Sequence, residues 1–152
     1  MNKAFNYKTL LGLTLAASLA ALTGCASVEK MTGSVVSTVR GDAKLTGAQE
    51  VPPVNTTATG AANIKVAADG SVSGKVTTAG ISSTAAHIHM APAGQNGPVV
   101  VPLAKNGDNV YMVPSGAKLT PAQLQAYKMG SLYVNVHSNA HKDGEIRAQL
   151  KP

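Results

Sequence analysis

The chain has 152 residues, a formal net charge of +6, one cysteine and no tryptophan. This length predicts a single domain once a leader is removed. The basic residues are scattered singly, and the only phenylalanine, Phe5, lies near the start. A basic patch with interleaved aromatic residues, which would indicate nucleic-acid binding, is missing from the sequence, so we expect no nucleic-acid partner.

The first 24 residues have the pattern of a bacterial lipoprotein signal peptide. Lys3 and Lys8 form a basic start, and residues 10–22 form an apolar run that is too short for a comfortable membrane span. The run ends in Leu-Thr-Gly-Cys, which resembles a lipobox, so Cys25 is the expected lipidation site. The alternative is a protein without a lipid anchor that buries Cys25.

A lipidated Cys25 leaves the mature domain without a thiol, which excludes disulfides and thiol catalysis there. Residues 25–41 are rich in Ser, Thr, Gly and Val and are expected to form a lipid-anchored tether, with a first strand at residues 34–39 as an option. The domain is expected to span residues 42–152. The anchor predicts a cell-envelope location, at an outer membrane facing the periplasm or at the cell surface, and an envelope protein is a candidate partner.

Turn signals divide residues 42–152 at the spacing that is typical of an all-β domain. Asp69-Gly70 and Asn106-Gly107 indicate tight turns, because glycine tolerates positive φ. The apolar run at 99–103 predicts a strand that is buried on both faces. Strands are expected at residues 43–47, 58–67, 72–78, 85–90, 99–103, 110–113, 132–137 and 145–150. This pattern predicts an antiparallel β-sandwich of seven or eight strands with one short helix.

The short helix is predicted at residues 121–129. Thr120 is a capping residue, Pro121 suits the first helical position, and Gln123 can complete a capping box. Gly130 is a typical C-terminal stop.

The four histidines are concentrated in two segments. His87 and His89 stand two apart in a strand, so their side chains share one face, with backbones roughly 7 Å apart. His137 alternates with the apolar residues of its strand and is expected to point, with Tyr133 and Asn135, toward solvent or the rim of a site. His141 lies in the loop that follows. This arrangement predicts a metal site made of His87, His89 and His137, with His141 as a further ligand.

Imidazole nitrogens suit Cu(II), Zn(II) and Ni(II), and intrinsic affinity among divalent ions favours copper, with zinc as the second choice. Met90 is expected to point away from the histidine face, which favours core packing over a thioether ligand. The alternative interpretation is that the His-x-His pair arose by chance and that an imidazole only hydrogen-bonds a loop carbonyl.

The acidic residues are few and give no catalytic pair. Glu145 and Arg147 stand two apart and are expected to form an exposed or half-buried pair on one face. No two carboxylates have a spacing suited to acid–base work, no serine lies in a nucleophile elbow, and no phosphate loop is present. We therefore assign no catalytic residue, and histidine-based metal chemistry is the only catalytic route left.

Several motifs, in this order, resemble the CHRD domain, a family named for chordin and found in many exported bacterial proteins. The motifs are LTGAQEVPPV at residues 45–54, AHIH at 86–89, GQNGPVV at 94–100, LYVNVHS at 132–138 and GEIRAQL at 144–150. The resemblance covers about residues 42–150 and implies an immunoglobulin-like or superoxide-dismutase-like sandwich. His87, His89 and His137 match the recurrent histidines of the family, whereas His141 lies in its more variable turn.

The resemblance implies no settled activity. The His-x-His strand is also similar to the copper strand of copper/zinc superoxide dismutases, but the chain has no disulfide and no second cluster of zinc ligands. The leading hypothesis is a non-enzymatic, lipid-anchored envelope protein that binds copper or zinc for metal buffering or delivery. The alternatives are a structural or protein-interaction module without metal, and a copper-dependent oxidoreductase.

Overall fold

The computed structural model describes residues 42–152. The predicted signal peptide, the tether, the optional strand at residues 34–39 and Cys25 lie outside these residues. Within the described part, no helix is both long and apolar enough to cross a membrane.

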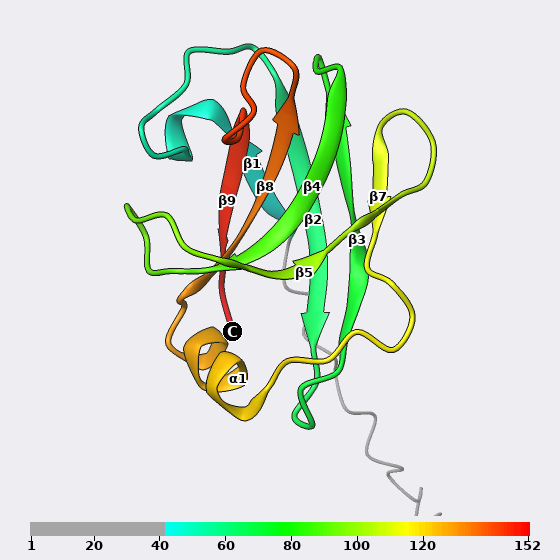
Figure 1. The fold of residues 1–152 in the computed structure, drawn as a ribbon, viewed down its shortest axis with the longest axis vertical. Coiled ribbons are helices and arrows are strands. Elements are labelled where there is room, and N and C mark those ends of the chain that lie inside the picture. The colour runs from blue at the N-terminus through cyan, green and yellow to red at the C-terminus, as the bar shows by residue number, and fades with distance from the viewer. Residues whose placement is uncertain (1–41) are drawn as a thin grey trace, which may run out of the picture. The chain divides into compact units, whose positions relative to one another are not determined.

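The described residues form mostly antiparallel β-structure (Figure 1). The strands are β1 (Ala43–Thr46), β2 (Thr59–Val66), β3 (Val72–Ala79), β4 (Ser83–Met90), β5 (Val99–Pro102), β6 (Ala104–Lys105), β7 (Val110–Met112), β8 (Leu132–Ser138) and β9 (Ile146–Leu150). A 3-10 turn, η1 (Gly47–Gln49), follows β1, and the α-helix α1 (Pro121–Lys128) lies between β7 and β8. The strands form one sheet in the order β5-β4-β8-β9-β1-β2-β3-β7-β6.

Residues 99–105, which we call the closing segment, bring the two edges of this sheet together. β5 pairs with β4, and β6 pairs with β7, with only Leu103 between them. The Leu103 N–H donates to the Ala86 carbonyl of β4 at 3.0 Å, and Lys105 Nζ donates to the Ser83 carbonyl of the same strand at 3.0 Å. The predicted all-β antiparallel fold with one short helix is therefore confirmed, in the form of a nearly closed, barrel-like sheet.

The prediction that residues 99–103 are buried on both faces is wrong. Val101 is buried, but Val99 is 48% exposed. β5 belongs to a single curved sheet whose core lies on one side, so only its inward side chains find a core to pack against.

The core lies inside the curved sheet and follows the period of two that strands impose. Ile88 of β4 lies opposite Val134 of β8, which lies opposite Ala148 of β9, and all three are at most 2% exposed. On the other face of the same strands the register runs from His87 through Asn135 to Arg147. The alternation that builds the core thus also gathers a set of polar side chains on the outer face.

Helix α1 lies at one end of the sheet, near the C-terminus (Figure 1). Its predicted capping box is present: Thr120 Oγ1 accepts from the Gln123 N–H at 3.3 Å, and Gln123 Oε1 accepts from the Thr120 N–H at 2.8 Å. The helix ends at Lys128, one residue before the predicted end. Tyr127 packs against the core and its hydroxyl donates to the Lys151 carbonyl at 3.2 Å.

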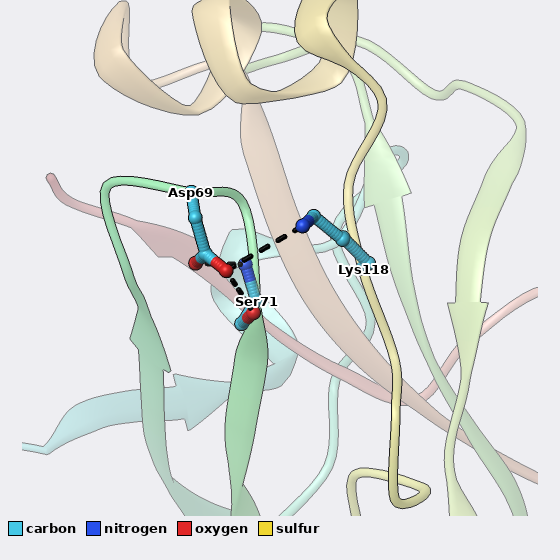
Figure 2. A network of polar contacts seen from close by, with 3 residues as sticks. All are labelled: Asp69, Ser71 and Lys118. Atoms are coloured by element: carbon cyan, nitrogen blue, oxygen red, sulfur yellow. Dashed lines mark hydrogen bonds and ion pairs between the residues drawn. The ribbon is translucent and has the colours of Figure 1, made fainter.

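The turn between β2 and β3 carries an exposed polar network of Asp69, Ser71 and Lys118 (Figure 2). Asp69 accepts hydrogen bonds from the Ser71 N–H at 3.0 Å and the Ser71 hydroxyl at 2.7 Å, and its carboxylate lies 3.4 Å from Lys118 Nζ. These contacts, led by the backbone N–H of Ser71, lower the pKa of Asp69 to about 2.

Candidate metal centre

Three of the four histidines converge on the outer face of the sheet. His87 and His89 come from β4, and His137 comes from the end of β8. One ring nitrogen from each side chain lies within 4.8 Å of the other two. Such a cluster of imidazoles can hold a metal ion.

Backbone carbonyls fix the orientation of two of these rings. His89 Nδ1 donates to the Gly97 carbonyl at 2.9 Å, and His137 Nδ1 donates to the Lys142 carbonyl at 2.8 Å. A carbonyl only accepts, so the proton of each neutral ring resides on Nδ1 and the lone pair on Nε2. Histidines that bind metals commonly have this second contact, which sets the tautomer and the direction of the ligating nitrogen.

The third ring lies very close to one of these lone pairs. His87 Nδ1 and His137 Nε2 are 2.9 Å apart. Without a metal, the His87 N–H donates to His137. Two nitrogens at about 2.05 Å from one ion would be about 2.9 Å apart at a right angle and about 3.3 Å apart at a tetrahedral angle. Both nitrogens are therefore close enough to be ligands of one ion, once the His87 proton resides on Nε2 in place of Nδ1.

Burial favours the neutral form of two rings in this cluster, those of His87 and His89. It is the largest cause that lowers the pKa of His87, and the neighbouring His137 and His89 lower it further. The pKa of His89, which is 8% exposed, is also lowered chiefly by burial, although its bond to the Gly97 carbonyl opposes this. Both imidazoles therefore have a free lone pair at neutral pH, as metal binding requires.

His141 lies apart from the three-histidine cluster, in the turn between β8 and β9. Its backbone N–H donates to Ser138 Oγ at 3.1 Å, and its carbonyl accepts from the N–H groups of Ser138 and Gly144, each at 3.2 Å. These bonds shape the turn that brings the Lys142 carbonyl to His137. The ligand role of His141 stays a prediction.

The expectation that Tyr133 and Asn135 face solvent or a rim is wrong. Each is 2% exposed, because the segment between β4 and β5 folds back over β8 and β9. Arg147, 1% exposed, holds this segment: its Nη1 donates to Asn96 Oδ1 at 3.1 Å and its Nη2 donates to the Gln95 carbonyl at 2.9 Å.

Arg147 is connected to the metal centre through an aromatic ring. Its Cζ lies 3.4 Å from the centroid of the Tyr133 ring. That ring in turn stacks on His89, with centroids 4.9 Å apart and planes inclined by 9°. The Tyr133 hydroxyl accepts from the Gly97 N–H at 3.2 Å, while the Gly97 carbonyl accepts from His89. The Gly97 peptide group and the Tyr133 ring thus both fix the orientation of the His89 ring.

The predicted exposed or half-buried pair of Glu145 and Arg147 is wrong. Both side chains are buried, and Glu145 accepts from the Thr56 hydroxyl at 2.8 Å. Among the described residues the only ion pair within 4.0 Å joins Lys118 and Asp69.

Sequence reasoning missed a second buried carboxyl group. Glu50 is 5% exposed, and burial raises its pKa to about 7, although the charge of Arg147 and the Val51 N–H lower it. A Cβ at Gly144, whose φ is +134°, would lie 2.6 Å from Glu50 Oε1 and 2.6 Å from Asn135 Nδ2. Glu50 therefore lies close to the amide of Asn135, and position 144 beside these two side chains has room only for a glycine. The alternation of polar and apolar residues in β8 and β9 was a sequence signal that Asn135 and Arg147 share this face, but it gave no sign of Glu50.

A family model described as CHRD domain matches residues 41–150. The chain belongs to the CHRD domain family. The match covers most of the chain and includes every residue of the three-histidine cluster. No curated protein and no solved structure matches the chain. The geometry of this CHRD domain is therefore the basis for any statement about its function.

Proposed function

We propose that this CHRD domain binds one metal ion through His87, His89 and His137. The observation that carries the proposal is the convergence of three imidazole nitrogens within 4.8 Å. Two of the rings also donate their other N–H to a carbonyl, which is the usual second contact of a histidine ligand. The burial that lowers the pKa of His87 and His89 supports binding at neutral pH, because no proton has to leave those rings.

Copper is the metal that we favour, and zinc is the second choice. A site with only nitrogen donors suits both ions, and the intrinsic order of affinities places Cu(II) above Zn(II).

The role that we propose is metal buffering or delivery by an envelope lipoprotein anchored through Cys25. The signal-peptide pattern of residues 1–24 supports an exported, lipid-anchored protein. His87 and His137 are only partly buried, which gives an ion a route in and out and suits transfer to a partner protein. The proposed role does not involve catalysis.

Two alternatives each have one supporting observation. The bonds of His89 and His137 to carbonyls also pin two loops, which is what a structural or interaction module without metal requires. Three protein ligands leave a coordination position open, which is what a copper-dependent oxidoreductase requires. Superoxide turnover by the copper-loaded protein no faster than that of free buffer would eliminate a dismutase.

The test is a calorimetric titration of the metal-free protein with Cu(II) and then with Zn(II). We expect one ion per chain at micromolar affinity or tighter, with Cu(II) bound more tightly than Zn(II). His89→Ala should weaken binding by about 100-fold or more, because a ligand is lost from a set of three. Asn139→Ala, an exposed change in the β8–β9 turn, is the control and should leave the affinity unchanged. An intact fold that gives no binding heat would contradict the proposal, and so would equal losses in the two variants.

A further inference from the structure

The outer face of the sheet has buried polar atoms that lack a hydrogen-bond partner among the described residues. Three of them lie on this face: His89 Nε2, Asn135 Oδ1 and Glu50 Oε1. Buried polar atoms without partners are uncommon and destabilising, so each calls for an explanation. The proposed metal ion accounts for His89 Nε2 but not for Asn135 Oδ1.

Asn135 lies in the middle of the histidine cluster. It is opposite His87 in the register of β4 and β8, and it is two residues before His137 on the same face of β8. Directly opposite residues of an antiparallel pair have Cβ atoms about 4.5–5.5 Å apart, so the amide is within reach of the ion-binding space. The side chain is 2% exposed and cannot turn out to bulk water.

The contacts of the amide settle which end faces the histidines. Asn135 Nδ2 donates to the Asp143 carbonyl at 3.2 Å and lies near Glu50. With Nδ2 bonded there, Oδ1 is the end of the amide left without a partner on the face that Asn135 shares with His87 and His137.

His89 Nε2 and Asn135 Oδ1 are therefore two unpaired buried acceptors on the same face of the sheet. His89 Nε2 is an acceptor because the ring proton is on Nδ1, which donates to Gly97. Two acceptors repel each other unless a cation or a donor lies between them. A metal ion on His89 that also carries a water molecule supplies both: the ion takes the nitrogen lone pair, and the water donates to the amide oxygen.

We propose that Asn135 Oδ1 accepts a hydrogen bond from a water molecule that fills the fourth coordination position of the metal. This inference rests on the proposed function. Asn135 is then not a ligand but a residue that determines which small molecule can take the fourth position. Water, which can donate, is stabilised there, whereas azide has no hydrogen to donate and brings a third acceptor into the same space.

The test is a titration of the Cu(II)-loaded full chain with azide, followed by the azide-to-copper absorption band. Asn135→Ala removes the acceptor, and we expect azide affinity to rise about 2- to 10-fold, the worth of one hydrogen bond. Asn135→Leu keeps the volume and should behave in the same way if the alanine variant does not fold. Asn139→Ala, an exposed asparagine of the β8–β9 turn, is the matched control and should leave azide affinity unchanged.

Equal azide affinities in the wild type and in both Asn135 variants would overturn the inference. A fall in Cu(II) affinity as large as that of His89→Ala, with a changed copper EPR spectrum, would also overturn it, because Asn135 would then be a direct ligand. The proposed function fails separately, when the wild-type protein binds no copper or when His89→Ala binds as well as the wild type. If copper binding is lost in His89→Ala but azide affinity is the same with and without Asn135, only the inference about the water is contradicted.

Discussion

Two polar networks within residues 42–152 differ in burial and in how completely their hydrogen bonds are satisfied. The exposed network joins Asp69, Ser71 and Lys118 beside one turn (Figure 2). The ion pair in it has side chains that are 58% and 60% exposed, and each charged group has a partner or water. The buried network lies on the outer face of β4, β8 and β9 and includes the three-histidine cluster.

The buried network depends on residues that are distant in the sequence. Arg147 holds Gln95 and Asn96, and the Tyr133 hydroxyl holds Gly97. It also retains lone pairs that nothing in the described chain satisfies. Exposed ion pairs contribute little to stability, whereas unsatisfied buried atoms have a cost. The buried network, whose unpaired atoms lower the stability of the fold, is therefore the better candidate for a functional site.

The largest expected effect on stability comes from Arg147→Gln. It removes the guanidinium bonds to residues 95 and 96 and the cation–π contact with Tyr133, so we expect the free energy of unfolding to fall by about 2–4 kcal/mol. Urea denaturation of the metal-free protein measures this. Lys118→Gln is the control in the exposed network and should change the midpoint far less. Similar losses in the two variants would show that burial does not separate the networks.

A smaller loss, about 2–3 kcal/mol, is expected for Gly144→Ala. The new Cβ would collide with the buried side chains of Glu50 and Asn135, and a φ of +134° is strained for alanine. Gly107→Ala is the matched control, because its φ is +90° and no atom lies within 4 Å of the new Cβ. It should cost about 1 kcal/mol. Equal thermal shifts in the two variants would mean that the collision is absent in solution.

The third prediction concerns pH and Glu50. Its folded pKa, about 7, is above its ordinary value of 4.5, so the folded state binds the proton more tightly than the unfolded state. This contribution is complete below pH 4.5 and is lost as the pH rises to about 7, by at most about 3 kcal/mol. Glu50→Gln should abolish that loss between pH 4.5 and 7 in denaturation curves of the metal-free protein.

Asp69→Asn provides the control of opposite sign for Glu50. The folded pKa of Asp69 is about 2, below its ordinary value, so its contribution is present above pH 3.8 and is lost as the pH falls through 2. The Asn variant should therefore lack this contribution above pH 3.8 and lack the wild type's fall in stability toward pH 2, while its pH dependence between 4.5 and 7 stays that of the wild type. A pH dependence of the wild type between 4.5 and 7 that persists in Glu50→Gln would show that another group causes it.

Local rules predicted the local features. The period of two placed His87 and His89 on one face of β4, and short-range capping chemistry placed the start of α1 at Pro121. Met90 was predicted to point away from the histidines, and it packs against the core. These features depend on residues within a few positions of one another, which a single sequence displays directly.

Features that depend on distant contacts were missed. Tyr133 and Asn135 were expected near solvent because alternation shows which face a side chain takes but not what covers that face. Arg147 is 51 residues from Asn96, and nothing in the pattern of either segment indicates their contact. The two residues of β6 are too few to show a period, so the near closure of the sheet could not be predicted.

The closing segment has a consequence for crowded surfaces. An open sheet offers unpaired backbone groups to the strands of other molecules, and this template is a common route to aggregation. Here residues 99–105 occupy both edges, and the free sides that remain belong to β5 and β6, which have four and two residues, with Pro98 directly before β5 and Pro102 at its end. Proline has no N–H to offer a further strand. Copies of this domain at high local concentration would thus have little means to join by intermolecular strand exchange.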